Sequence, residues 1–184
     1  MAVLWISIAI VAVIAVSVIA MYNKLVSLKN QTLNGWKQID VQLKRRHDLI
    51  PNLVETVKGA MSFEQNTLTR VIEARNRAIS AEGVAAKAAE ENALTGALRQ
   101  LFALTENYPD LKANQNFLAV QEELSSTENK IAFSRQAYND QVLFFNNKTQ
   151  MFPSNIIAAM FAFAKRDFFE VTGAAEREVP KVSF

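Results

Sequence analysis

The sequence contains no cysteine, which excludes disulfides, thiolate metal sites and thiol nucleophiles. Glycine and proline are scarce, with five and four residues in a chain of 184. Helix-favouring residues dominate the rest, so we expect an all-α fold. The net charge of +2 is small, and Lys and Arg form no dense basic face on the expected helices, so no nucleic-acid partner is predicted. The length fits one ordinary domain with an accessory segment.

Charged residues are missing from the N-terminal stretch between Val3 and Met21, which reads VLWISIAIVAVIAVSVIAM. At a rise of about 1.5 Å per residue, this length matches a hydrocarbon core of about 30 Å. A cleaved signal peptide would have a basic start and a shorter apolar core, whereas no Lys or Arg precedes Trp5 here. We therefore predict a retained transmembrane helix over residues 3–21, with a buried core helix as the alternative.

The residues that flank this span predict its orientation. Trp5 and Tyr22 stand at its two ends, where aromatic side chains favour the membrane interfaces. Lys24 and Lys29 are close enough to meet anionic lipid, and both precede the first acidic residue, Asp40. By the positive-inside rule, the large domain is expected in the cytoplasm and the short N-terminus outside.

The stretch KRRHDLIPNLVETVKG at residues 44–59 places Pro51 inside an apolar helical pattern. Proline removes one helical hydrogen bond and would leave the carbonyl of His47 without its partner. The stripe nevertheless keeps its register through the proline, with apolar residues spaced by seven at Trp36, Leu43, Ile50 and Val57. We predict one helix, kinked between His47 and Pro51. Two helices, the second capped by Asp48, are the alternative.

The basic run Lys44, Arg45 and Arg46 lies far from the predicted span. A straight helix would place it on the order of 35 Å beyond Met21 at about 1.5 Å per residue, several Debye lengths from any headgroup. We interpret these side chains as solvated or as forming salt bridges between subunits, with a specific ligand site as the alternative.

The remaining chain predicts three more long helices. Ser62 and Gln65 resemble a capping box for a helix over 63–80, and Gly83 separates it from the next helix. Pro109 ends that third helix, and Asp110 is expected to cap a fourth helix over about 111–148. We expect an antiparallel bundle of about four long helices plus a short C-terminal helix, occupying residues 22–170.

The segment NIIAAMFAFAKRDFFEV at residues 155–171 is apolar nearly all round but too short to span a bilayer. It either closes the open end of the bundle or forms a docking surface for another protein. The candidate partner-binding residues are Phe161, Phe163, Phe168 and Phe169. Residues 171–184 are expected to form a loosely ordered tail.

Few residues form patterns that are typical of catalytic, metal-binding or phosphate-binding sites. The single histidine, His47, follows Lys44 at the position where di-iron bundles place a glutamate, and zinc ligands are lacking. We interpret His47 as a helix-surface or kink residue. No glycine-rich phosphate loop is present, and no serine has a convincing base. We predict no enzyme activity, catalytic residues, metal, cofactor or small-molecule substrate.

Polar residues that flank the core stripes form a second group. We expect a hydrogen-bonded network that fixes helix register, with a binding site for a partner's chain as the alternative. Charges near it, including those of Arg45, Arg46 and Glu128, are interpreted as surface charges. The candidate network residues are Asp48, Asn52, Glu55, Asn129, Arg135 and Asn139.

Three motifs together resemble the LemA family of bacterial membrane proteins. They are QIDVQLKRRHDLIPNLVETVKG at 38–59, NYPDLKANQNF at 107–117 and TENKIAFSRQAYND at 127–140. The resemblance extends from Tyr22 to about Glu170, and only the last residues fall outside it. It implies a helical bundle on one N-terminal anchor in the bacterial inner membrane. Some relatives are associated with magnetosome membranes, and others are linked to the membrane metalloprotease HtpX.

These observations lead to two functional hypotheses. The first is a membrane-anchored, noncatalytic scaffold or adaptor that forms homo-oligomers and presents a cytoplasmic domain to partners. The alternative is a regulatory or substrate-recruiting subunit of an HtpX-type membrane protease in envelope quality control. An enzyme acting on envelope components ranks below both, for want of catalytic groups.

Overall fold

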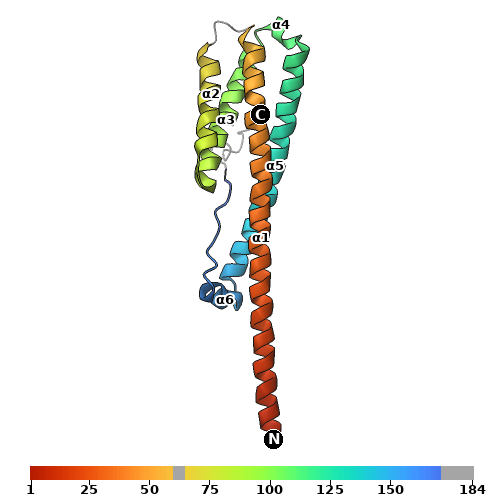
Figure 1. Cartoon of the computed structure of the whole chain (residues 1–184), viewed down its shortest axis with the longest axis vertical. Helices are drawn as coiled ribbons and strands as arrows, with labels where there is room; N and C mark the ends of the chain where they lie inside the picture. Colours follow the sequence, from red (N-terminus) through yellow and green to blue (C-terminus); the bar gives the residue numbers. More distant parts are fainter. Residues whose placement is uncertain (60–64, 171–184) are drawn as a thin grey trace, which may run out of the picture. The chain divides into compact units, whose positions relative to one another are not determined.

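The computed structural model describes residues 1–59 and 65–170. The predicted all-α fold is confirmed, because every regular element in these residues is a helix (Figure 1). The proposed cap at Ser62 and the tail over 171–184 lie outside the described residues. The helices are α1 (Ala2–Lys58), α2 (Gln65–Ser80), α3 (Val84–Thr105), α4 (Pro109–Lys112), α5 (Gln115–Gln150) and α6 (Ser154–Met160).

Helix α1 continues through Pro51 without a break, so the alternative of two helices is wrong. The predicted apolar stripe is confirmed on both sides of the proline, because Leu43, Ile50 and Val57 are buried and Trp36 is half-buried. Burial of this stripe offsets the loss of one backbone hydrogen bond. The kink itself stays a prediction.

The chain divides into two compact units. The first, called the anchor unit, combines Met1–Val41 with Ala132–Phe168. The second, called the hairpin unit, contains the described residues of Gln42–Ile131 together with Phe169 and Glu170. Helices α1 and α5 contribute residues to both units.

The core of the hairpin unit forms around α2 and α3. Gly83 adopts a φ of 82° immediately before α3, a conformation that glycine reaches without the steric cost of a Cβ. The buried core side chains from these helices are Leu68, Val71, Ala74, Ala78, Leu94, Leu98 and Leu101. Ile50, Leu53 and Val57 of α1 and Phe117 and Leu124 of α5 belong to the same apolar cluster.

The predicted fourth helix is in fact two helices, so its expected cap at Asp110 is wrong. Pro109 begins the short helix α4, and Asp110 lies in the first turn of that helix. Asn114 caps α5 instead, because its Oδ1 accepts hydrogen bonds from the backbone N–H groups of Asn116 at 2.9 Å and Phe117 at 3.3 Å.

In the anchor unit, α1 and α5 approach closely at Gly35. A Cβ added at Gly35 would collide with the side chain of Gln141 and would lie 3.5 Å from the Cα of Tyr138. One residue further on, the rings of Trp36 and Tyr138 pack with centroids 5.6 Å apart. A residue without a side chain therefore allows the two helices to meet.

Helix α6 ends in a tight reversal. Ala162 has a φ of 53°, and the N–H of Phe163 bonds to the carbonyl of Ala158 at 2.9 Å, as in a Schellman motif. The returning chain is then fixed to α5. Asn146 exchanges two hydrogen bonds with the backbone of Arg166, both of 2.9 Å.

Candidate interaction surfaces and a buried ionic cluster

The first part of α1 is long and apolar enough to cross a membrane. None of its most apolar window is buried inside the protein (0%), whereas the core helix of a soluble domain would be largely covered. The alternative of a buried core helix is therefore wrong. Exposed apolar side chains on every side of a helix fit a membrane anchor.

The predicted membrane-interface residues lie at the two ends of this segment. Trp5, Tyr22, Lys24 and Lys29 are all exposed. The ring of Tyr22 packs against that of Phe161, with centroids 4.7 Å apart. Residues just beyond the apolar segment therefore contact the chain that follows α6. Their position at lipid headgroups stays a prediction.

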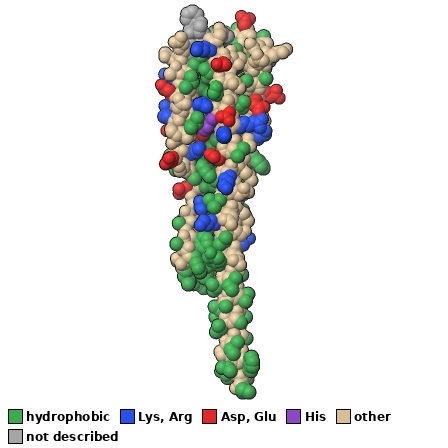
Figure 2. Space-filling model, in the orientation of Figure 1, with side chains coloured by type: hydrophobic (Ala, Val, Ile, Leu, Met, Phe, Trp, Pro, Cys, Tyr) green, Lys and Arg blue, Asp and Glu red, His purple; other side chains and the backbone are tan. Residues whose placement is uncertain are grey.

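The four phenylalanines predicted to bind a partner differ in their surroundings. Phe161 is exposed, Phe163 and Phe168 are half-buried, and Phe169 is buried. Other exposed apolar side chains accompany Phe161. Figure 2 shows hydrophobic side chains gathered over α6, beside the apolar part of α1. The large exposed ones around α6 are Met151, Phe152, Ile156, Met160 and Phe161.

The residues predicted to form a polar network lie on the outside of the helices or at their edges. Asp48, Asn52, Glu55 and Asn129 are exposed, and Arg135 and Asn139 are half-buried. The buried ionic cluster that the structure describes consists of other residues. Its members are Arg46 and His47 from α1, Glu91 and Thr95 from α3, and Glu128 from α5.

Arg46 is the centre of this ionic cluster and is only 1% exposed. Its Nη2 donates to Glu91 Oε2, and its Nη1 donates to Thr95 Oγ1 at 2.8 Å and to Glu128 Oε1. The interpretation of Arg46 as solvated or intersubunit is therefore wrong. A buried guanidinium needs paired carboxylates to offset its lost hydration. Arg45, one residue earlier, is exposed and pairs with Glu123.

His47 is buried, so its interpretation as a helix-surface residue is wrong, whereas a role at a kink stays a prediction. Its Nε2 lies 2.9 Å from Glu91 Oε1. Burial alone would raise the pKa of Glu91, but the hydrogen bond from His47 and the charge of Arg46 outweigh burial and lower that pKa. Glu91 is therefore a carboxylate at neutral pH and holds both side chains of α1 against α3.

The ionic cluster offers no evident chemistry beyond this structural role. Thr95 Oγ1 accepts from Arg46 and donates to the main-chain carbonyl of Glu91 at 3.1 Å, so its hydroxyl is already engaged. Within the described part of the chain, no group of three or more His, Asp and Glu side chains is placed to hold a metal ion.

Sequence reasoning missed Glu91, although the pattern contained a signal. Arg46 occupies a position of the buried α1 stripe, between Leu43 and Ile50. Glu91 likewise occupies a position of the α3 stripe, with Leu94 and Leu98 on the same side. Opposite charges within two apolar stripes indicate a buried ion pair, since an isolated charge there would be costly.

A second polar contact answers the question raised by Pro51. Proline has no N–H to donate to the carbonyl of His47, four residues earlier. Arg75 of α2 donates its Nε–H to that oxygen at 2.7 Å. An arginine side chain therefore replaces the missing helical hydrogen bond.

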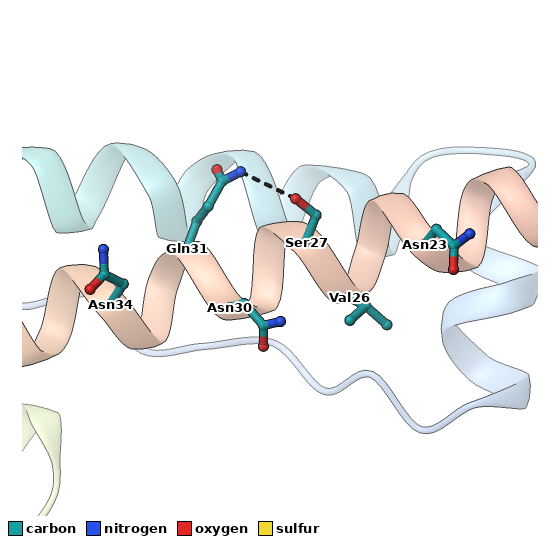
Figure 3. Close-up of a pocket in the computed structure, with 6 residues that line it drawn as sticks. All are labelled: Asn23, Val26, Ser27, Asn30, Gln31 and Asn34. Atoms are coloured by element: carbon teal, nitrogen blue, oxygen red, sulfur yellow. Dashed lines mark hydrogen bonds between the residues drawn. The ribbon is translucent and has the colours of Figure 1, made fainter.

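A shallow groove of about 510 Å³ runs along α1 just beyond the apolar segment. Figure 3 shows its six lining side chains, all from α1, with Gln31 donating to Ser27 Oγ at 3.3 Å. None of the lining residues is charged. They are Asn23, Val26, Ser27, Asn30, Gln31 and Asn34.

The sequence also matches known proteins. The family model for LemA matches residues 35–184, so the expectation that the last residues fall outside the resemblance is wrong. Protein LemA of Metamycoplasma hominis is 26% identical over 87% of this chain and 71% of its own length. Magnetosome protein MamQ 2 of Paramagnetospirillum magneticum is 22% identical over 86% of this chain and 68% of its own. Magnetosome protein MamQ of Magnetospirillum gryphiswaldense is 20% identical over the same shares of the two chains, 86% and 68%. The family match covers most of the chain, which therefore belongs to the LemA family.

Proposed function

We propose that this protein is a noncatalytic scaffold, anchored in the bacterial inner membrane by the start of α1. It self-associates and presents its helical domain to partners in the cytoplasm. The supporting observation is the continuity of α1 from Ala2 to Lys58. The same helix is apolar and exposed at its start, and it supplies Ile50 and Leu53 to a folded core near its end.

The surface proposed for self-association is the asparagine seam, defined as Asn23, Ser27, Asn30 and Asn34. These residues are exposed, and at about 100° per residue they lie within roughly 60° of one another around α1. The opposite side of the helix carries the buried residues Leu25, Leu28 and Thr32. The seam therefore faces away from the core of its own chain.

A second copy of the chain fits this seam. Copies anchored in the same membrane insert in the same direction, so equal positions of α1 face each other. An asparagine amide both donates and accepts hydrogen bonds and can pair with its own equivalent. Asparagine at the seam of a parallel coiled coil also fixes register and oligomeric state.

The spacing of the seam continues into the apolar segment. Counting back by three and four residues from Asn23 gives Ala20, Val16, Val13 and Ala9. Of these, Ala20 and Ala9 are small, and small side chains allow transmembrane helices to approach closely. One face of α1 can therefore join two copies both inside and just beyond the bilayer.

The proposed absence of catalysis rests on the described residues. The buried carboxylate of Glu91 is engaged by Arg46 and His47, and the names of the relatives refer to no reaction. The cytoplasmic orientation rests on Lys24 and Lys29, which precede the first acidic residue of the chain.

Disulfide crosslinking tests self-association directly, because the natural chain has no cysteine. Asn30→Cys in the full chain should form a disulfide-linked homodimer in native membranes on mild oxidation. Lys29→Cys is the matched control, because it is exposed at the same height on another side of α1. Equal yields at the two positions, or only monomer at both, would contradict the proposed seam. Capture of a membrane protease in place of a second copy would favour the regulatory-subunit alternative.

A further inference from the structure

The segment around α6 exposes an unusual amount of apolar surface. We define the apolar elbow as residues 151–161. Phe152 is 81% exposed and Met160 is 70% exposed, and Met151, Ile156 and Phe161 are also exposed. An apolar patch of this kind marks an interaction surface rather than an ordinary loop.

The other side of the apolar elbow is firmly packed. Ile157 and Ala158 are buried against Leu25, with Val18 and Met21 at the edge of the same cluster. Ser154 donates its hydroxyl to the carbonyl of Lys148 at 2.6 Å. The elbow is therefore fixed against α1 and α5. Its exposed side chains cannot become buried there, because other side chains of the elbow already occupy that contact.

The place where the elbow is held is the end of the membrane-spanning segment. Val18 lies inside the apolar run that ends near Met21, about 5 Å before its end at about 1.5 Å per residue. Since Val18 packs against the elbow cluster, the elbow lies at the level where hydrocarbon gives way to headgroups.

The charges around the elbow are those expected of a segment at the boundary between hydrocarbon and headgroups. Residues 149–164 carry no charge, whereas Lys148, Lys165 and Arg166 flank the stretch. Lys29 of α1 adds another cation, with its Nζ 5.9 Å from the centroid of the Phe163 ring. Apolar side chains bordered by cations are typical of segments that lie in a membrane interface and meet anionic headgroups.

We propose that the apolar elbow is immersed in the interfacial layer of the same membrane that α1 crosses, with a lipid surface as its partner. Phe152, Met160 and Phe161 contact acyl chains, and Lys148, Lys165 and Arg166 contact phosphate groups of lipid. This inference rests on the membrane anchoring in the proposed function. It gives the domain a second attachment to the bilayer, which restrains its tilt and rotation about α1.

Fluorescence quenching by lipid tests this proposal. Single variants Phe152→Cys and Met160→Cys of the full chain are labelled with an environment-sensitive fluorophore and placed in vesicles of phosphatidylcholine and phosphatidylglycerol. Some of the lipid carries a nitroxide near the headgroup end of an acyl chain. Phe133→Cys is the matched control, because Phe133 is an exposed aromatic residue of the same unit, at 77%, far from α6 along α5. Ile14→Cys, measured with the nitroxide near the methyl end of the acyl chain, reports on the span itself.

The proposal predicts blue-shifted, strongly quenched emission at positions 152 and 160, together with unquenched emission at 133. Unquenched, water-like emission at 152 and 160 while position 14 is quenched would overturn the inference and leave the anchor intact. Blue-shifted but unquenched emission at 152 and 160 would overturn it as well, because protein rather than lipid would then cover the elbow. Unquenched emission at position 14 would contradict the anchor and, with it, the inference.

Discussion

Arg75 of α2 donates its Nε–H to the main-chain carbonyl of His47 at 2.7 Å, the carbonyl that Pro51 leaves without a helical partner. Together with burial of the apolar stripe of α1, this contact stabilises one continuous helix through a proline. It also connects the carbonyl of His47 in α1 with a side chain of α2 that lies 28 residues further along the chain.

Arg75→Met should therefore destabilise the protein by about 1–3 kcal/mol, the cost of leaving a buried acceptor unpaired. In the Pro51→Ala background, the cost should be clearly smaller, because residue 51 then supplies its own N–H to His47. Urea unfolding of the four proteins in detergent gives the coupling energy. Equal costs in the two backgrounds would show that the carbonyl of His47 is not what Arg75 stabilises.

Arg46→Met should be more damaging, because it leaves Glu91 buried and without its guanidinium partner. Breaking one side of a buried ion pair costs about 3–5 kcal/mol. The double variant Arg46→Met/Glu91→Leu should recover most of the loss, since apolar side chains of similar volume replace the pair. Thermal unfolding monitored by circular dichroism measures the stability of the single and the double variant. A double variant as unstable as the single one would contradict the proposed pairing.

The lowered pKa of Glu91 predicts a loss of stability in acid. In the folded protein this pKa lies below its ordinary value of 4.5. The carboxylate therefore stabilises the fold above about pH 4.5, and this stabilisation is lost as the pH falls through the folded pKa. Glu91→Gln should therefore be less stable than the natural protein at neutral pH and should converge with it in acid. Glu90→Gln, which removes a carboxylate paired at the surface with Arg77, is the control and should change the pH profile little. A constant difference between Glu91→Gln and the natural protein at every pH would refute this linkage.

Replacing Gly96 by alanine should stabilise the protein. Gly96 lies inside α3 and is exposed, and a Cβ added there would meet nothing within 4 Å. Gly96→Ala should raise the free energy of unfolding by about 0.5–1 kcal/mol through helix propensity. Gly83→Ala is the contrast, because its φ of 82° disfavours a side chain, and it should lower stability. Urea midpoints that move in the same direction for both variants would argue against this explanation.

The helices that could be predicted from the sequence are those with long, regular stripes. The spacing of Leu43, Ile50 and Val57 was enough to predict that α1 continues through Pro51. The break between α4 and α5 was harder to predict, because Asp110 and Asn114 are both good capping residues. Only the hydrogen bonds of Asn114 distinguish them.

The positions of Arg46 and Glu91 within apolar stripes signal a buried ion pair, but the pattern alone does not show that these two residues are partners. Arg46 stands in a run of basic residues that is typical of a solvated surface, and its partner Glu91 lies 45 residues further along the chain. Their pairing depends on how α1 and α3 align, which is a property of tertiary packing. The apolar elbow posed a similar difficulty, because a short segment that is apolar on all sides does not indicate which side is covered.

The central claim is that the start of α1 remains attached and anchors the protein in the membrane. Extraction of membranes with alkaline carbonate, followed by intact-mass measurement of the full chain, tests this claim most directly. The account predicts that the protein stays in the membrane pellet at a mass that includes Val3–Met21. Release into the soluble fraction, or a mass lacking this segment, would contradict it.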